Sequence, residues 1–125
     1  MGINAPELLT DNHNISNFCC DVESLDDWVK KRAIKSQTRS HIKVYVVTES
    51  ETMQVVGYYA IGSFRRNAPN PIPVLVLTRL AVHLEYQGDA IGVGLLKDCT
   101  LRSVKAMGIV GGAGILVHAI DESIL

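Results

Sequence analysis

The sequence has little of several features that mark particular classes of protein. Three of its 125 residues are cysteines (Cys19, Cys20 and Cys99), and none stands in a C-x-x-C pair. This argues against a disulfide framework and a structural zinc site, and we predict no bound metal. No apolar run reaches the ~18 residues of a membrane-spanning helix, and the N-terminus lacks a signal-peptide pattern. We therefore expect a cytoplasmic protein without a membrane partner.

The sequence also lacks an excess of positive or negative charge, because the formal net charge is −1. A chain so close to neutrality produces no overall field that predicts a nucleic-acid or membrane partner. The distribution is less even, since residues 30–66 hold eight basic and two acidic side chains. On charge alone, a solvated helix face with a basic loop explains this segment somewhat better than a polyanion site. The length and the 47% hydrophobic content predict one domain with one core over residues 1–125.

Hydrophobic periodicity predicts a mixed order of helices and strands. Two β-branched and aromatic runs are separated by a polar turn and predict a hairpin, and a longer run that is apolar on both faces predicts a central strand. A loop with three prolines connects the hairpin to that strand. In chain order the sequence predicts a helix at 22–37, strands at 43–48 and 54–63, a loop at 64–73, a strand at 74–83, a helix at 90–107 and a strand at 114–120.

The helical patterns also predict which side chains are buried. Asp21 stands where the N-cap of the first helix would be, followed by acidic and then basic residues that complement the helix dipole. The stripe expected to face the core in the first helix is Val22, Leu25, Trp28, Val29 and Ala33. In the second helix it is Ile91, Leu95, Cys99 (or Thr100), Val104 and Met107. His13 and His41 lie among polar residues and are expected to be exposed.

The stretch QGDAIG, residues 87–92, places small residues between the central strand and the second helix. A phosphate at a helix N-terminus meets unpaired backbone amides and the positive end of the dipole, and small residues let it approach. The stretch is not a Walker loop, because no Lys-Ser/Thr pair follows, and it lacks the Rossmann G-x-G-x-x-G pattern. By pattern alone, a plain helix cap and a diphosphate site are equally good interpretations.

The order of elements resembles the GNAT superfamily of N-acetyltransferases, whose acetyl-CoA loop follows Gln/Arg-x-x-Gly-x-Gly/Ala at this place. Ala90 stands for the middle glycine of that motif. The segments ESLDDWVKKRAIKSQ, VVGYYAIGS, RRNAPNPIPVLVLTRLAV, YQG and GILVHAIDE are similar to toxin acetyltransferases of bacterial type II toxin–antitoxin modules. The resemblance runs through most of residues 5–122. It implies an α/β fold with a mixed, largely antiparallel sheet, helices on both faces and a fifth main strand as the last.

The resemblance also implies a cofactor, a substrate and partners. The backbone of Leu80, Ala81 and Val82 would pair with the pantetheine arm of acetyl-CoA as an extra strand. The turn that would take the pyrophosphate comprises Gln87, Gly88, Asp89, Ala90, Ile91 and Gly92. The acetyl acceptor would be the α-amine of aminoacyl-tRNA, with Arg65 and Arg66 in the tRNA footprint. A ribbon-helix-helix antitoxin would neutralise the protein.

The sequence departs from the family pattern in places that bear on activity. The family continues past VHAIDE into a helix with Ala-x-x-Phe-Tyr, whose tyrosine protonates the departing thiolate, and we expect a C-terminally shortened domain without it. No catalytic residue is assigned; His83 is a better candidate than His118, which is expected to be a core or edge residue. Asp89 stands where the family commonly has Arg or Lys and would repel phosphate. The last strand, left as an edge, predicts a homodimer.

Three functions remain open at this point. The first is an acetyl-CoA-dependent toxin that acetylates aminoacyl-tRNA and blocks translation, or a shortened relative of one. The second is a non-catalytic module that binds CoA or an antitoxin and regulates by occupancy. The third is an acetyltransferase for small-molecule amines, which the basic segment at 30–66 disfavours.

Overall fold

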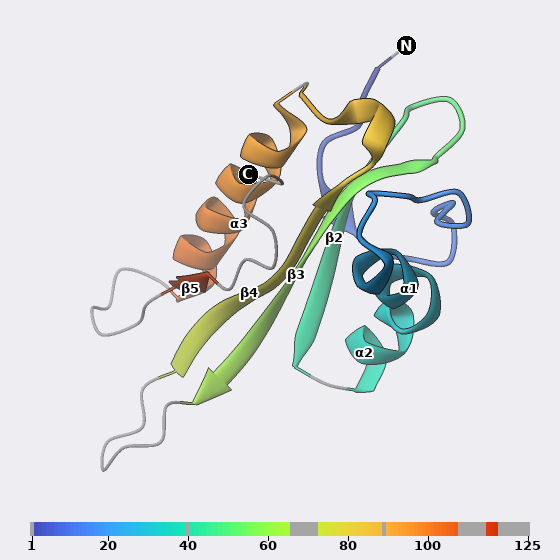
Figure 1. The fold of residues 1–125 in the computed structure, drawn as a ribbon. Coiled ribbons are helices and arrows are strands. Elements are labelled where there is room, and N and C mark those ends of the chain that lie inside the picture. Colours follow the sequence, from blue (N-terminus) through green and yellow to red (C-terminus); the bar gives the residue numbers. More distant parts are fainter. Residues whose placement is uncertain (1, 40, 66–72, 89, 108–114, 118–125) are drawn as a thin grey trace.

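The chain folds around one five-stranded sheet with helices on both faces (Figure 1). The computed structural model describes residues 2–39, 41–65, 73–88, 90–107 and 115–117. The strands are β1 (Glu7–Leu8), β2 (Ile42–Thr48), β3 (Val55–Arg65), β4 (Pro73–Val82) and β5 (Ile115–Val117), in the order β1-β2-β3-β4-β5. Neighbours from β1 to β4 are antiparallel and β5 is parallel to β4. The predicted mixed, largely antiparallel sheet is confirmed.

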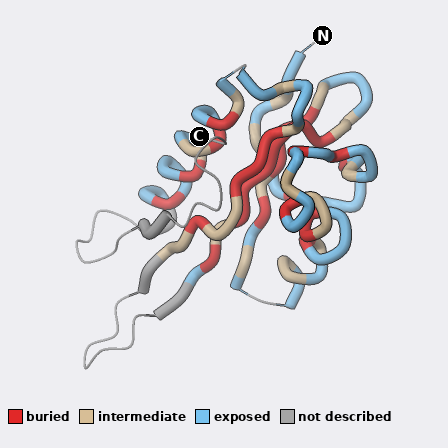
Figure 2. Tube along the Cα trace, viewed as in Figure 1, coloured by how far each residue is buried: buried red, intermediate tan, exposed pale blue. Residues whose placement is uncertain are grey.

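The helices form two layers that cover opposite faces of this sheet (Figure 1). Helices α1 (Glu23–Lys31) and α2 (Ala33–Arg39) lie on one face, and α3 (Ile91–Met107) lies on the other, after a 3-10 turn η1 at Leu84–Tyr86. Figure 2 shows the buried residues concentrated in the middle of the sheet and on the helix sides that face it. Within the described residues, no helix is both long enough and apolar enough to cross a membrane.

Each face of the sheet has its own hydrophobic cluster, because alternate residues of a strand point to opposite sides. The cluster under α1 and α2 is rich in aromatics and includes Phe18, Trp28 and Tyr58. The cluster under α3 is built from aliphatic side chains around Tyr59, Leu95 and Cys99. The predicted central strand 74–83 contributes to both clusters, as Leu80 and Ala81 show.

The first predicted helix is interrupted, and its N-cap prediction is wrong. Arg32 has φ −125° and ψ −18°, which separates α1 from α2 in place of one helix over 22–37. Val22, not Asp21, is the N-cap residue, and it makes no side-chain capping bond. Asp21 has φ +70° and precedes the cap, while Asp26 from inside the helix accepts a bond from the amide of Cys20. The carboxylate that fastens this helix start therefore comes from its first turn.

The buried face predicted for α3 is partly wrong. Leu95 and Cys99 are buried as expected, but the next inward residue is Ser103, and Val104 is 57% exposed. The i, i+4 line through 95, 99 and 103 is the one that meets the sheet, which leaves Thr100 exposed as well. The apolar character of Val104 therefore misled the assignment of the face, and the side chain of Met107 lies outside the described residues.

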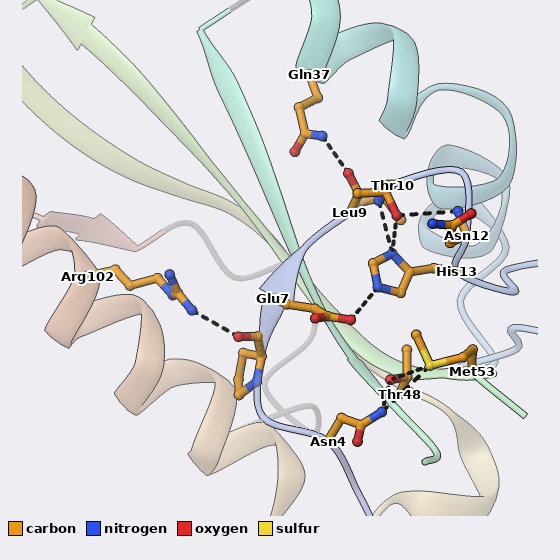
Figure 3. A network of polar contacts seen from close by, with 11 residues as sticks. Asn4, Glu7, Leu9, Thr10, Asn12, His13, Gln37, Thr48, Met53 and Arg102 are labelled. Atoms are coloured by element: carbon orange, nitrogen blue, oxygen red, sulfur yellow. Dashed lines mark hydrogen bonds and ion pairs between the residues drawn. The ribbon is translucent and has the colours of Figure 1, made fainter. Parts of the chain in front are cut away.

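The N-terminal segment is tied to the sheet and to both helical layers (Figure 3). Gln37 of α2 donates to the carbonyl of Leu9, and Arg102 of α3 donates to the carbonyl of Pro6. His13, expected to be exposed, is only 8% exposed. Its Nδ1 accepts from the Thr10 amide, so Nε2 carries the proton and donates to Glu7 at 2.7 Å. The correction follows from local bonding that a polar neighbourhood in sequence does not reveal; His41 is exposed as expected.

Candidate cofactor site

Strand β4 is divided at Thr78 by a bulge. Arg79 pairs with Ala60 and Leu77 pairs with Ile61, so β4 has one residue more than β3 between these two pairs. Thr78 is that extra residue, and its hydroxyl donates to the carbonyl of Ala60 at 3.1 Å. A bulge bends a strand and increases its twist. The first half of β4 (residues 73–77) and the second half of β4 (residues 78–82) therefore run in different directions.

The bulge lies directly after the described β4–β5 pairing. Strand β5 pairs with residues 75–77, in a parallel register from Leu75 with Ile115 to Leu77 with Val117. In the described part of the chain, the second half of β4 has a strand partner on one side only, which is β3. We call the other side of residues 78–82, which has no described strand partner, the split.

The backbone of the second half of β4 presents groups to this split. The amide of His83 donates to the carbonyl of Val56. Antiparallel pairs alternate between residues that bond to each other and residues whose groups point away. Ala81 is thus bonded to Tyr58, whereas the N–H and C=O groups of Leu80 and Val82 point away from β3. We call these outward groups the open edge of β4, and such an edge can accept an extended ligand as an added strand.

Gln87 fastens the end of the open edge to the segment before α1. Its side-chain Nε2 donates to the carbonyl of Val82 at 2.9 Å and lies 3.4 Å from the carbonyl of Cys20. The amide of Leu84 also donates to Cys19, at 2.8 Å. Gln87, predicted within the pyrophosphate turn, thus has a side chain that holds β4 in place. Gln87 therefore links the segment before α3 to the segment before α1 at the end of β4.

The turn into α3 has a backbone conformation that suits small residues. Gly88 has φ +93° and Ala90 has φ +63°, both in the left-handed region that favours glycine. The first hydrogen bond of the helix runs from the Gly94 amide to the Ala90 carbonyl. The amides of residues 91–93 precede it and have no acceptor inside the helix, where the positive end of the dipole lies. Asp89 lies outside the described residues.

Gly57 determines how closely α3 approaches this part of the sheet. It lies on β3 opposite Val82. A Cβ at this position would be 3.0 Å from Cδ1 of Leu95 and 3.1 Å from Cγ2 of Ile91, closer than ordinary van der Waals contact. Because there is no side chain, the first two turns of α3 rest on the sheet beside the open edge. The N-terminus of α3 is positioned by this contact.

A polar cluster anchors the C-terminal part of α3 to the same sheet face. The hydroxyl of Tyr59 donates to Oδ2 of Asp98 at 2.7 Å, and Arg102 donates to the same oxygen at 2.8 Å. The guanidinium also lies 4.3 Å from the ring of Tyr45, which stacks on Tyr59. Burial, and secondarily the bond to Asp98, raises the pKa of Tyr59. The phenol therefore stays protonated and acts as a structural donor.

His83 has both ring nitrogens in use. Nδ1 accepts from the amide of Glu85 at 3.1 Å, so Nε2 carries the proton and donates to the carbonyl of Asn17 at 3.2 Å. Phe18 and Tyr86 contact the ring edge-on. This geometry makes His83 a structural link between the end of β4 and the N-terminal segment; His118 lies outside the described residues. No group of three or more His, Cys, Asp or Glu that could hold a metal occurs among the described residues.

The structure brings together the predicted cofactor residues but leaves the predicted tRNA contacts apart. Leu80, Ala81 and Val82 end β4, and the turn η1 connects them to the turn at residues 87–92. Arg65 is the last residue of β3 and pairs with Pro73 at the far end of the hairpin, and Arg66 lies outside the described residues. Sequence reasoning missed Thr78 and Gly57. Two adjacent polar residues in an apolar strand, and a glycine inside a strand, are signals for a bulge and a close approach.

Known proteins resemble this chain over nearly its whole length, although no family model matches it. It is 35% identical over 132 residues to the tRNA-acetylating toxin of Mycobacterium tuberculosis, which covers 97% of this chain and 78% of that protein. It is 31% identical over 122 residues to the probable toxin TacT of Sinorhizobium fredii, with 87% and 66% covered. A mutant AtaT toxin, solved with the C-terminus of the antitoxin AtaR and acetyl-CoA, has the same fold with a TM-score of 0.83. It is 26% identical, and the match covers 96% of this chain and 77% of that one.

Proposed function

We propose, from the premise that this chain belongs to the family of GNAT-type tRNA-acetylating toxins, that it binds acetyl-CoA in the split beside β4 and transfers the acetyl group to the α-amine of aminoacyl-tRNA. Such a reaction in the cytoplasm would remove charged tRNA from translation. The observation that carries this proposal is the open edge of β4, which is followed, after the short turn η1, by the turn at the start of α3.

The open edge of β4 suits the pantetheine arm of acetyl-CoA, and the start of α3 suits its pyrophosphate. The carbonyl of Leu80 and the amide of Val82 would pair with the amides of the pantetheine arm, as in strand addition. The Val82 carbonyl already accepts from Gln87, and the Leu80 amide remains for the thioester. The pyrophosphate would lie at the start of α3, where the amides of residues 91–93 and the helix dipole favour an anion. This arrangement directs the thioester toward Leu80 and the bulge at Thr78.

The chemistry then requires an amine beside the thioester. The neutral α-amine would attack the carbonyl carbon, a C–N bond would form and the C–S bond would break. The proton lost from the nitrogen would pass to the departing thiolate, so that CoA leaves as the thiol. An outward amide on the open edge, that of Leu80, is available to stabilise the oxygen of the tetrahedral intermediate. The chain's contribution at this place is orientation and a fixed hydrogen-bond donor.

Two partners complete the proposal. The first partner is an antitoxin that would neutralise the protein. AtaT, a solved relative, is bound to the C-terminus of its antitoxin, and we propose a ribbon-helix-helix protein here.

The second partner is another copy of the chain. It would cover β5, whose residues 115–117 follow β4 on the far side of the sheet from β1. The oligomer is tested by light scattering at high micromolar concentration, where a monomer would contradict it.

Calorimetry with acetyl-CoA is the direct test of the cofactor site. The parent protein is expected to bind, and Gly88→Val is expected to weaken binding because valine disfavours φ +93°. Gly94→Ala is the matched control, since a Cβ at this position meets nothing within 4 Å. Parent protein that shows no binding at millimolar cofactor would contradict the proposal.

Transfer is tested with labelled acetyl-CoA and charged tRNA. Label on the α-amine of the amino acid is the expected result. Cofactor binding without transfer to any acceptor would favour a non-catalytic regulatory module. Equal transfer to free amino acids and to charged tRNA would favour a small-molecule acetyltransferase.

A further inference from the structure

Arg79 occupies an unusual position on β4, directly after the bulge at Thr78. Its guanidinium carbon lies 4.3 Å from the centre of the Trp28 ring. Trp28 itself stacks on Tyr58 with an interplanar angle of 15°. The guanidinium is therefore held on an aromatic face from the α1–α2 layer, and it is half-buried. Stacking of this kind orients the planar group and its donors.

A second arginine lies on the same side. Arg32 follows Trp28 by four residues, which places both on one face of the helical segment, and it is exposed at the break between α1 and α2. Burial lowers the pKa of Arg79, Tyr58 raises it, and the charge of Arg32 lowers it further. Arg32 therefore adds positive charge on the side of the sheet where Arg79 lies.

This positive charge has no acidic partner in the described part of the chain. The ion pairs found there join Glu7 to His13, Asp27 to Lys31 and Asp98 to Arg102. A methionine or leucine at position 79 would cover Trp28 equally well without the cost of like charges and partial burial. Arg79 is thus an unneutralised, oriented donor, with the exposed Arg32 on the same side, and it matches a phosphate, which guanidinium groups bind in a bidentate manner.

The position of Arg79 and Arg32 bears on the path by which the acetyl acceptor would reach the thioester. In the proposed function the thioester lies beside Leu80 and Thr78. On the α3 side of the sheet this region is filled by Leu77, Leu80 and Leu95. The side chain of Arg79 leaves the strand on the opposite side, where Trp28 lies. An acceptor that reaches the thioester from the α1–α2 side would pass Arg79 and Arg32.

We propose that Arg79, held on Trp28, and Arg32 bind a backbone phosphate at the 3′ end of the charged tRNA and so select a nucleic-acid-linked amine over a free one. The inference rests on the proposed function for its reaction, but the binding step is measured without catalysis. Phosphates of acetyl-CoA are the other source of the same chemistry, and the experiment separates the two.

The binding experiment titrates uncharged tRNA with the parent protein and with Arg79→Met and Arg32→Met. Each variant is expected to weaken tRNA binding about tenfold and to lower the slope of log K against log salt by about 0.7–0.9 per lost phosphate contact. Arg79→Lys retains the charge on Trp28 and is expected to lose less. Lys97→Met is the matched control, because Lys97 is an exposed cation on α3, on the other sheet face. Calorimetry should give the same affinity for acetyl-CoA in all of these proteins.

A kinetic comparison uses two acceptors that differ in phosphate. Arg79→Met is expected to raise KM for aminoacyl-tRNA about tenfold, with kcat retained, and to leave KM for an aminoacyl-adenosine within about twofold. Trp28 is the sole tryptophan of the chain, so its fluorescence reports both the fold of each variant and a phosphate that draws Arg79 from the ring.

The outcomes separate this inference from the proposed function. Unchanged tRNA affinity in folded Arg79→Met and Arg32→Met would overturn the inference even if acetyl transfer is found. A loss of acetyl-CoA affinity in the same variants would assign the arginines to the cofactor and overturn it as well. Weakened tRNA binding in a protein that transfers no acetyl group would support the phosphate site and contradict the proposed reaction.

Discussion

The two halves of β4 share a partner on one side and differ on the other. Both halves pair with β3, but the first half also pairs with β5 over residues 75–77. The second half ends in the turn to α3 and presents the open edge at Leu80 and Val82. One extra residue, Thr78, separates them. The difference teaches that a single extra residue in one strand can leave outward backbone groups beside a paired segment of the same strand.

Deletion of Thr78 should have the largest effect on this difference. Without it, Leu77 and Arg79 become consecutive and the alternation of side chains between the two faces is preserved. The strand should straighten, β5 pairing should extend past residue 77, and acetyl-CoA affinity should fall at least about 100-fold, because the edge that takes the ligand becomes paired. Calorimetry measures the loss, and hydrogen exchange measures new protection of residues 80 and 82.

Thr78→Val is the control for that deletion. It retains the length of β4 and removes only the hydroxyl that donates to Ala60, so affinity should change by no more than a few-fold. A deletion variant that binds acetyl-CoA as the parent does would mean that the split does not depend on the bulge.

Gly57→Val should affect the second half of β4 more than the first. The new side chain would contact Leu95 and Ile91 below van der Waals distance, and overpacking of this kind costs about 1–3 kcal/mol. Urea unfolding measures the loss. Gly94→Ala, where a Cβ meets nothing, should instead stabilise by up to ~1 kcal/mol because Gly is unfavourable inside a helix. Similar unfolding free energies for the two variants would contradict the close approach of α3.

Gln87→Leu tests how the open edge is held. The variant loses the bond to Val82 and the longer one to Cys20, which should cost about 0.5–1.5 kcal/mol in stability. Acetyl-CoA affinity should fall by a similar free energy, because Val82 is no longer fixed. Glu85→Gln, an exposed neighbour in η1, should leave both quantities unchanged; an equal effect of the two substitutions would show that Gln87 has no positioning role.

The sequence predicts the helices and strands better than it predicts the geometry of the candidate site. Strands β2 to β5 and α3 were placed within a few residues by periodicity, because burial of alternating or helical faces is recorded in the order of apolar residues. Strand β1, the break at Arg32, the cap at Val22 and the burial of His13 were not predicted, since hydrophobic periodicity records neither backbone angles nor side-chain hydrogen bonds. The residues proposed for the cofactor site follow one another along the chain, but the orientation of their backbone groups was not predicted, because register decides which groups face outward.

A change of pH should have little effect on stability near neutrality and a growing effect above pH 9. Tyr58 and Tyr59 lie opposite Ala81 and Leu80, one on each face of the sheet. Burial raises the pKa of both phenols in the folded protein, and burial raises the pKa of Cys20 to about 12. A raised folded pKa gives stability that is complete below the unfolded value and is lost as pH rises.

The unfolding free energy should therefore decrease from pH 9 upward, first through Cys20 and then, above pH 10, through the tyrosines. Each group that ionises only in the unfolded state contributes at most ~1.4 kcal/mol per pH unit. Denaturant unfolding between pH 7 and 11 measures the slope, and Tyr59→Phe should reduce it above pH 10. The same slope in that variant would mean that Tyr59 is not held protonated by the fold.

The sequence by itself determined the order of the elements, the glycine turn before α3 and the apolar character of β4, because these depend on local conformational preference and on which residues avoid water. Only the tertiary structure decided that Thr78 is a bulge, that the described β4–β5 pairing ends at Leu77, and that Arg79 packs on Trp28 with no acidic partner among the described residues. Those features depend on pairing register and on contacts between residues far apart in the chain. No local pattern specifies them, since the same run of residues 73–82 would form a regular central strand beside a partner of different register.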